Sequence, residues 1–420
     1  MITIDVPNFV DPRRNGPYAT LAVAVSTYVF AYSTLYGPVS ILLYYALWLP
    51  WLVFLLPVIR ITPTLTVLVG IVAFILASIM WSDQPGTSLR SGLQYASHIA
   101  CIIVAATIVS FSSLARGLVV GTAFVALYSL FVGRYSYDVL DGTYTLVGAF
   151  GSKNSLGFNS SIGAYFALAF WFSDRLPLRD RLIVAIALPV LLLTLWRSQS
   201  ATSIASLAAA AAVFVVLRVV GTWPPMTRRL ASFVGWVVLA LSPLVAASTG
   251  LYEGVLSIFG KDTTLTGRTY LWAEGYETFL ERPWFGLGYQ AFWVQGSAPA
   301  EQLWQEFYIT SRTGFHFHNT FIELLVQLGL LGAIPFIALL VWSFVRCLRR
   351  LTVHGDAKAA ALCGLALMFL VRAMFEVDTL TAYSIGSFLV LYIWVAPWSL
   401  IGARAMPAGF AKPSLVQERT

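Results

Sequence analysis

Apolar stretches of about 20 residues recur along nearly the whole chain, and this pattern constrains the fold most strongly. Each is long enough to cross about 30 Å of hydrocarbon as a helix. Because backbone polar groups find no water inside a membrane, only helices and closed barrels span it. Of the 420 residues, 58% are hydrophobic and 11% are charged, whereas soluble domains carry about 25% charged residues. The sequence therefore predicts an all-α, polytopic integral membrane protein.

Hydropathy predicts about twelve transmembrane helices within a single membrane domain that covers residues 1–420. The predicted spans are Ala19–Leu35, Val39–Ile59, Leu65–Met80, Leu93–Val109, Leu118–Val132, Leu156–Phe172, Leu182–Leu195, Thr202–Val220, Phe233–Ser248, Phe321–Val345, Ala359–Phe375 and Tyr383–Trp398. We expect cytoplasmic tails at 1–18 and 401–420, and one large periplasmic loop at 249–317, between the ninth and tenth helices. The first residues carry charges and prolines instead of a short apolar core, so we expect no cleavable signal peptide.

The distribution of basic residues supports this topology. With the N-terminus inside, 17 of the 26 Lys and Arg residues fall on the cytoplasmic side, as the positive-inside rule predicts when both termini are cytoplasmic. The outward basic residues are Arg90, Arg134, Lys153, Arg197, Lys261, Arg268, Arg282, Arg312 and Arg372. Because the basic balance reflects orientation, we expect no nucleic-acid partner.

Outward arginines suit phosphate or pyrophosphate, which a guanidinium holds through forked, charge-assisted hydrogen bonds. Several of them should instead pair with carboxylates. Arg372 and Glu376 stand four residues apart on one predicted helix, so we expect that these two side chains form a structural ion pair.

A histidine-rich stretch, "FHFHNTFIELLVQLGLLG", runs directly into a predicted span. Thr320 and Glu323 have the spacing of a capping box, which leaves His316, His318 and Asn319 unexplained. If Thr320 caps the helix, His318 lies just outside its positive end, where a neutral imidazole able to act as a base is favoured and an anion is attracted. The alternative is an interfacial histidine that only bonds a loop carbonyl.

Three further segments are informative. "LWRSQSATS" places Arg197 at a tight outward turn, and "AFGSKNSLGF" brings Lys153 and Asn154 to the start of a span. In the large loop, Tyr270–Leu280 has helical spacing and the following Arg-Pro pair would end such a helix. His98, inside a span, is expected to form a helix–helix hydrogen bond.

Several classes of function lack their motifs. The chain has no P-loop, no dinucleotide-binding glycine loop, no nucleophile elbow and no metal-spaced Cys/His cluster, and its three cysteines are not placed for a disulfide or a metal. We therefore expect no cofactor and no metal. No internal repeat is visible, so the inverted-repeat pattern of many transporters is missing.

Taken together, these motifs resemble a known family. "TGRTYLWAEGYETFLERPWFGLGYQAFW" followed by the histidine-rich stretch looks like the large periplasmic loop and next helix of the O-antigen ligase and Wzy-type polymerase superfamily. "WSDQPGTSLR", "GAFGSKNSLGF" and "SQSATS" resemble landmarks of its exopolysaccharide-polymerase branch. The resemblance covers roughly residues 60 to 400. It implies a multi-pass protein of the bacterial inner membrane that uses glycans carried on undecaprenyl pyrophosphate.

The resemblance also implies roles for residues. His318 matches the family's periplasmic histidine, which activates the acceptor hydroxyl, and Arg268 matches the arginine of its Gly-Arg motif, which holds the donor pyrophosphate. Where many members carry a basic residue in the serine-rich turn, this chain has Ala201, and Arg197 is the nearest substitute. The further candidates for binding pyrophosphate or glycan are Arg197, Arg90, Lys153, Asn154, Arg312, Asn319 and Glu323.

The chemistry of these residues fits metal-independent, inverting glycosyl transfer. A neutral imidazole can take the proton of a sugar hydroxyl, and arginines can stabilise a departing pyrophosphate. The first hypothesis is polymerisation of lipid-linked repeat units, with a chain-length regulator and export machinery as possible partners. The alternatives are a ligase that transfers the same donor glycan to lipid A-core or another acceptor, and a transporter, which the large aromatic loop disfavours.

Overall fold

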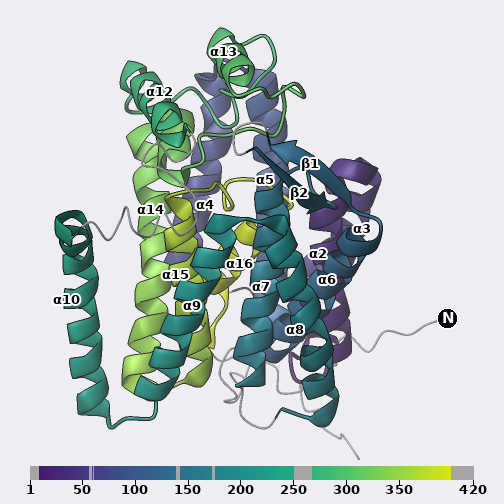
Figure 1. Ribbon diagram of the computed structural model, residues 1–420, viewed down its shortest axis with the longest axis vertical. Coiled ribbons are helices and arrows are strands. Elements are labelled where there is room, and N and C mark those ends of the chain that lie inside the picture. Colours follow the sequence, from purple (N-terminus) through teal and green to yellow (C-terminus); the bar gives the residue numbers. More distant parts are fainter. Residues whose placement is uncertain are drawn as a thin grey trace, which may run out of the picture.

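The computed structural model describes residues 9–55, 59, 61–138, 142–172, 176–249 and 267–398, which are mostly helical (Figure 1). The helices are α2 (Gly16–Tyr36), α3 (Pro38–Leu55), α4 (Pro63–Ala77), the 3-10 turn η1 (Ser78–Met80), α5 (Pro85–Ile108), α6 (Phe111–Phe131), α7 (Lys153–Trp171), α8 (Leu178–Ser198), α9 (Ala201–Val220), α10 (Pro225–Thr249), α12 (Arg268–Glu281), α13 (Ala298–Glu306), α14 (Thr320–His354), α15 (Ala357–Ala373) and α16 (Ile385–Val395). Each predicted span coincides with one of these helices.

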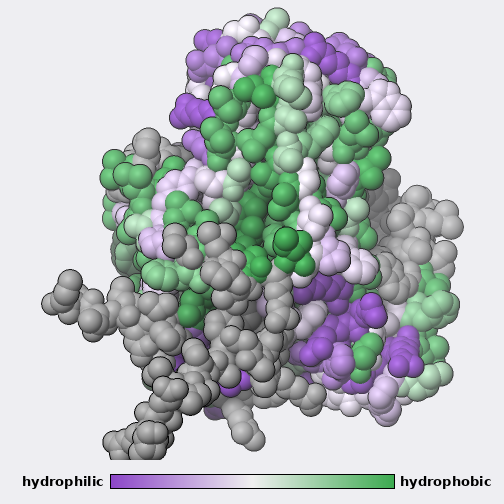
Figure 2. Space-filling model, turned by 180° about the vertical axis from the view of Figure 1, so that it is seen from behind, coloured by the Kyte–Doolittle hydropathy of each residue, from purple (hydrophilic) through white to green (hydrophobic). Residues whose placement is uncertain are grey.

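Within the described part of the chain, five segments are long and apolar enough to cross a membrane. They are Pro63–Met80, Pro85–Ile108, Phe111–Phe131, Ala201–Val220 and Thr320–His354. Most other helices run alongside them, and α12 and α13 lie together at one end (Figure 1). Hydrophilic surface gathers over that end and again at the opposite end, with apolar surface between (Figure 2). The protein is therefore a multi-pass membrane protein.

The segment 267–319, which we call the cap, contains α12, α13 and their connecting loops. It forms a hydrophobic cluster of its own around Phe279, Phe292 and Trp304, which also includes Val326 of α14. The predicted helix in this loop is confirmed, because α12 ends at Glu281, directly before Arg282 and Pro283. The first part of the predicted loop, 250–266, lies outside the described residues.

Helix α14 is broken at Gly329, whose backbone (φ 59°, ψ −169°) is open to glycine and strained for other residues. The cap fills the break with its own backbone. Leu287 N and Gly288 N donate to the carbonyls of Val326 and Gln327 at 2.9 and 3.0 Å. On the other side of the break, two amides of α14 donate to the carbonyls of residues 283 and 284. Since these bonds satisfy the exposed backbone groups of the break, they attach the cap firmly to the bundle.

A two-stranded antiparallel hairpin, β1 (Arg134–Asp138) and β2 (Thr143–Gly148), stands between α6 and α7. The hydropathy analysis predicted no element between the spans Leu118–Val132 and Leu156–Phe172, because two short strands leave a weak alternating pattern. The inner half of β2 is buried, and Ala149 packs with Tyr32 and Val125 beneath the hairpin. The hairpin lies towards the same end of the bundle as the cap (Figure 1).

Candidate functional site

His318 lies in the loop that leads from the cap into α14. Its backbone is left-handed (φ 52°), and the residue after it, Asn319, is the N-cap of α14: the Asn319 side chain accepts from the amides of Phe321 and Ile322. His318 thus stands immediately before the positive end of a helix, as predicted. Its Nδ1 atom is 3.5 Å from Glu376 Oε2, and its side chain is 21% exposed.

Arg268 approaches the same carboxylate from the cap. It is the first residue of α12 and follows Gly267, whose left-handed backbone (φ 82°) favours glycine at the helix start. Arg268 Nη2 is 3.1 Å from Glu376 Oε1, and Nη1 donates to the carbonyl of Phe375 at 2.7 Å. The structure therefore brings together Arg268 and His318, which are far apart in the sequence.

Glu376 is the centre of the cluster and was not predicted as a site residue. It is almost fully buried, and its Oε1 atom also accepts from Asn154 Nδ2 at 2.9 Å. Burial by itself would raise the pKa of Glu376, but the charge of Arg268 and the contact with His318 outweigh it and hold the pKa well below its ordinary value. The carboxylate is consequently charged at neutral pH.

The predicted capping box of Thr320 and Glu323 was wrong for both residues. Thr320 is not the N-cap of α14, and it donates instead to the backbone carbonyl of Glu376 at 2.7 Å. Glu323 does not close a capping box; its carboxylate accepts from Phe317 N and from the Gln327 side chain. Asn319 takes the cap position instead, and its Oδ1 atom accepts from two amides at once.

Arg372 does not pair with Glu376 as expected. It forms a bidentate ion pair with Asp378, with contacts of 2.6 and 3.1 Å. α15 ends at Ala373, so Glu376 is no longer on the same helical face as Arg372 and turns towards the cap. The spacing rule failed here because the helix ends between the two residues.

A second row of polar contacts connects the cluster to the serine-rich turn between α8 and α9. Ser200 Oγ donates to Asn154 Oδ1 at 3.0 Å and lies 2.9 Å from Ser203 Oγ. Arg372 Nη1 in turn donates to Ser203 Oγ at 3.0 Å. The "GSKNS" and "SQSATS" motifs are thus joined to Glu376 by side-chain hydrogen bonds, which explains their polar composition beside buried helices.

Other predicted site residues take separate positions. Asn319 Nδ2 donates to the carbonyl of Met374 at the edge of the cluster, and Lys153 begins α7 beside Asn154. Arg312 is paired with Glu301 on the exposed side of the cap. Arg90 and Arg197 are exposed and contact no described residue through an ion pair or hydrogen bond. Substrate binding by these residues stays a prediction.

His98 has the role expected of it. Its ring lies between Tyr44 Oη of α3, at 2.9 Å from Nδ1, and Ser387 Oγ of α16, at 3.1 Å from Nε2. It is fully buried. His98 is therefore a helix–helix contact within the bundle.

His316, His318 and Glu376 are the residues in the described chain that could together hold a metal ion, since their ligand atoms all lie within 4.8 Å of one another. The donor set is a poor fit. Arg268 and Asn154 already bond Glu376 Oε1, and His316 Nδ1 accepts from the His318 amide at 3.0 Å. A cation bound there would compete with the guanidinium for the same carboxylate.

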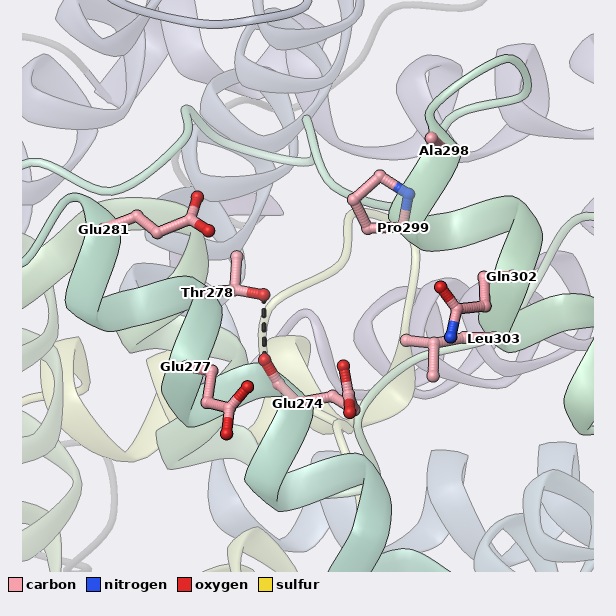
Figure 3. A pocket seen from close by; sticks show the side chains of 8 residues that line it. All are labelled: Glu274, Glu277, Thr278, Glu281, Ala298, Pro299, Gln302 and Leu303. Atoms are coloured by element: carbon pink, nitrogen blue, oxygen red, sulfur yellow. Dashed lines mark hydrogen bonds between the residues drawn. The ribbon is translucent and has the colours of Figure 1, made fainter.

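A hollow of about 290 Å³ lies between α12 and α13 in the cap (Figure 3). Its lining residues are Glu274, Glu277, Thr278, Glu281, Ala298, Pro299, Gln302 and Leu303. None belongs to the cluster around Glu376. Its three carboxylates would repel a pyrophosphate, so this hollow is not the donor site.

The fold and site define a multi-pass membrane protein with a firmly attached cap, where a histidine and an arginine approach the same buried carboxylate. The family model for O-antigen ligase matches residues 185–337. The chain is also similar to the exopolysaccharide production protein ExoQ of Rhizobium meliloti (strain 1021), at 43% identity over 396 residues, which cover 93% of this chain and 90% of that protein. The chain belongs to the O-antigen ligase and Wzy-type polysaccharide polymerase superfamily, in its exopolysaccharide branch.

Proposed function

We propose that this protein polymerises undecaprenyl-pyrophosphate-linked oligosaccharide repeat units into exopolysaccharide or O-antigen, by metal-independent, inverting glycosyl transfer. The observation that carries the proposal is the contact of His318 and Arg268 with the same carboxylate, Glu376, at the base of the cap. An acceptor hydroxyl and a donor pyrophosphate could bind side by side there. Family membership and the similarity to an exopolysaccharide production protein support this choice.

In the proposed reaction, the acceptor hydroxyl oxygen attacks the anomeric carbon of the donor sugar, and the bond from that carbon to the pyrophosphate oxygen breaks. His318 accepts the hydroxyl proton. Its Nδ1 atom faces Glu376, so Nε2 is the atom left to act as the base. The 3.5 Å separation from Glu376 is long for a hydrogen bond and would shorten when substrates fill the site.

Arg268 would stabilise the negative charge that develops on the leaving pyrophosphate. A guanidinium has five N–H donors, and the bonds to Phe375 and Glu376 use two of them. The remaining donors are available for phosphate oxygens. The charge of Glu376 keeps the guanidinium in place before substrate arrives, so that little reorganisation is needed during the reaction.

For the membrane topology, we propose twelve crossing helices, both termini in the cytoplasm, and the cap with its site on the periplasmic side of the bacterial inner membrane. The bias of basic residues supports this orientation. A lipid-linked donor would then reach the site from the surrounding bilayer. A chain-length regulator and export machinery stay predicted partners.

A ligase is the second candidate, because the matching family model describes an O-antigen ligase. It would use the same donor chemistry with a different acceptor. A transporter is disfavoured by α14: transporters use broken helices to bind substrate, but the break at Gly329 is occupied by the backbone of residues 283–288.

The test compares His318→Ala and Arg268→Ala in a strain that lacks the natural gene. His354→Ala is the matched histidine control, because His354 lies at the far end of α14, on an exposed position. Arg349→Ala is the matched arginine control, because Arg349 is also exposed near that end of α14 and is not a site candidate, and we expect long polymer from it as well. We expect single lipid-linked repeat units to accumulate in the first two variants, with long polymer in the His354→Ala strain.

Other outcomes separate the candidates. Polymer of normal length from a stably inserted His318→Ala protein would refute the base assignment. Long lipid-linked polymer that is never transferred would favour the ligase. Repeat units that stay on the cytoplasmic leaflet would favour a transporter.

A further inference from the structure

The β1–β2 hairpin exposes three tyrosines on one face. Tyr137 stands opposite Tyr144 across the strands, and Tyr135 stacks on Tyr144 with ring centroids 5.3 Å apart and an angle of 15° between the planes. The exposed fractions of Tyr135, Tyr137 and Tyr144 are 43%, 59% and 65%. Such a group of exposed rings indicates a surface that meets a partner.

The composition of the hairpin argues against a purely lipid partner. The other exposed side chains of the described strands are polar, namely those of Arg134 and Ser136, and the aliphatic side chains of Leu146 and Val147 are buried. A surface in contact with acyl chains would instead present aliphatic residues. Among the described residues, β1 pairs with β2 alone, so its outer edge presents backbone groups that have no strand partner there.

Hydrogen bonds attach the base of the hairpin to the chain that leads to the site. At its base, Arg134 Nη2 donates to the carbonyl of Phe150 at 3.4 Å, and Ala149 N donates to Ser129 Oγ at 3.2 Å. The chain then enters α7, whose second residue, Asn154, bonds Glu376. The tyrosine face and the cluster around Glu376 are therefore attached to the same helix start.

We propose that the face formed by Tyr135, Tyr137 and Tyr144 binds sugar rings of the glycan next to the reaction site; this rests on the proposed function. A pyranose ring has an apolar C–H face that can lie on an aromatic ring, and hydroxyls that can bond polar edges. Tyr135 and Tyr144 stack with nearly parallel planes, so the outward side of the pair and the ring of Tyr137 offer such a face, and the outer edge of β1 and the tyrosine hydroxyls offer the polar partners. The ligand class is a neutral or acidic oligosaccharide.

The experiment measures binding without turnover, in nanodiscs that hold the full chain with His318→Ala. The probe is a set of oligosaccharides of two or three repeat units, cut from the polymer of the producing strain. Two triple variants are compared in this background: Tyr135, Tyr137 and Tyr144 all replaced by Ala, and all replaced by Phe. Saturation-transfer NMR identifies contacts, and calorimetry gives the dissociation constants.

We expect the alanine variant to bind at least about tenfold more weakly, as loss of a central aromatic contact typically produces, and the phenylalanine variant to stay within about threefold of the parent. Equal binding by the alanine variant, or no binding by the parent, would overturn the proposal. So would poorer membrane reconstitution of the alanine variant with unchanged binding, which would identify an interfacial anchor. If the His318→Ala protein still polymerises glycan, only the proposed mechanism fails, because binding is scored separately.

Discussion

Replacing Glu376 by Gln tests whether this carboxylate positions the two proposed catalytic groups, His318 and Arg268. Glutamine keeps the shape of the side chain and an oxygen that can still accept from Asn154, but it removes the negative charge. His318 then loses the charged partner at 3.5 Å, and Arg268 loses the one at 3.1 Å. We therefore expect a slower reaction from a protein that still folds.

The contacts of Glu376 set the size of the expected fall in kcat and the expected loss of stability. A hydrogen bond to a charged group contributes about 1.5–3 kcal/mol, and each 1.36 kcal/mol of barrier is about tenfold in rate, so kcat should fall roughly 10- to 100-fold. The attraction between Arg268 and Glu376 at 3.1 Å is about 5 kcal/mol at an effective dielectric constant of about 20, partly offset by desolvation of both groups. The melting temperature should therefore fall as well.

The pattern of kinetic constants distinguishes positioning from binding. In Glu376→Gln the guanidinium of Arg268 is freed from its carboxylate, so KM for the lipid-linked donor should not rise. In Arg268→Ala, by contrast, KM should rise and kcat should fall. The assay uses purified protein in nanodiscs with labelled lipid-linked repeat units, and it follows the first coupling step at short times.

Glu301→Gln is the matched control, because Glu301 also pairs with an arginine, Arg312, but on the exposed side of the cap. We expect its kinetic constants to match the parent's, since exposed ion pairs contribute little. A Glu376→Gln protein that is folded and retains kcat within about twofold of the parent would contradict the positioning role, because the charge-assisted contact predicts at least about tenfold.

Three further predictions concern the backbone, acid and metal. Gly329→Ala should lower the free energy of unfolding by about 1–3 kcal/mol or more, because the new Cβ would lie 2.4 Å from the Trp284 carbonyl carbon. Gly235→Ala is the control, because nothing lies within 4 Å of a Cβ at that position. Equal melting temperatures of the two variants would contradict this reasoning. Burial and the neighbouring His318 lower the pKa of His316 to about 3. The contribution of neutral His316 to stability is therefore fully present above the ordinary histidine pKa and is lost as pH falls towards 3. When pH is lowered from 7 to 5, the melting temperature of the parent should fall more than that of His316→Gln. Chelators such as EDTA should leave the rate of purified protein unchanged, and a loss restored by added metal would refute metal independence.

Sequence reasoning found the helices because each depends on a local pattern. A run of apolar residues long enough to span a bilayer is visible without knowledge of its neighbours. The end of α12 before Pro283 and the place of His318 before a helix start were likewise readable, since both follow from the backbone chemistry of helix ends.

The hairpin and the break in α14 could not be predicted from the sequence, because both depend on contacts between distant segments. Gly329 is an ordinary small residue in an apolar run until the backbone of residues 283–288 packs into its position. The capping box failed for a related reason: Thr320 and Glu323 have the right spacing, but each found a stronger partner elsewhere.

The sequence by itself determined the class of the protein, its membrane helices, and the candidates His318 and Arg268, because hydropathy, charge bias and motif spacing are properties of the chain. Only the tertiary structure decided which carboxylate these residues share. Glu376 lies 58 residues beyond His318 and 108 beyond Arg268. Arg372, the opposite charge four residues before Glu376, was the wrong partner, because it pairs with Asp378. Packing of α15, α7 and the cap selects the pair, since an ion pair depends on distance in space and not on separation in sequence.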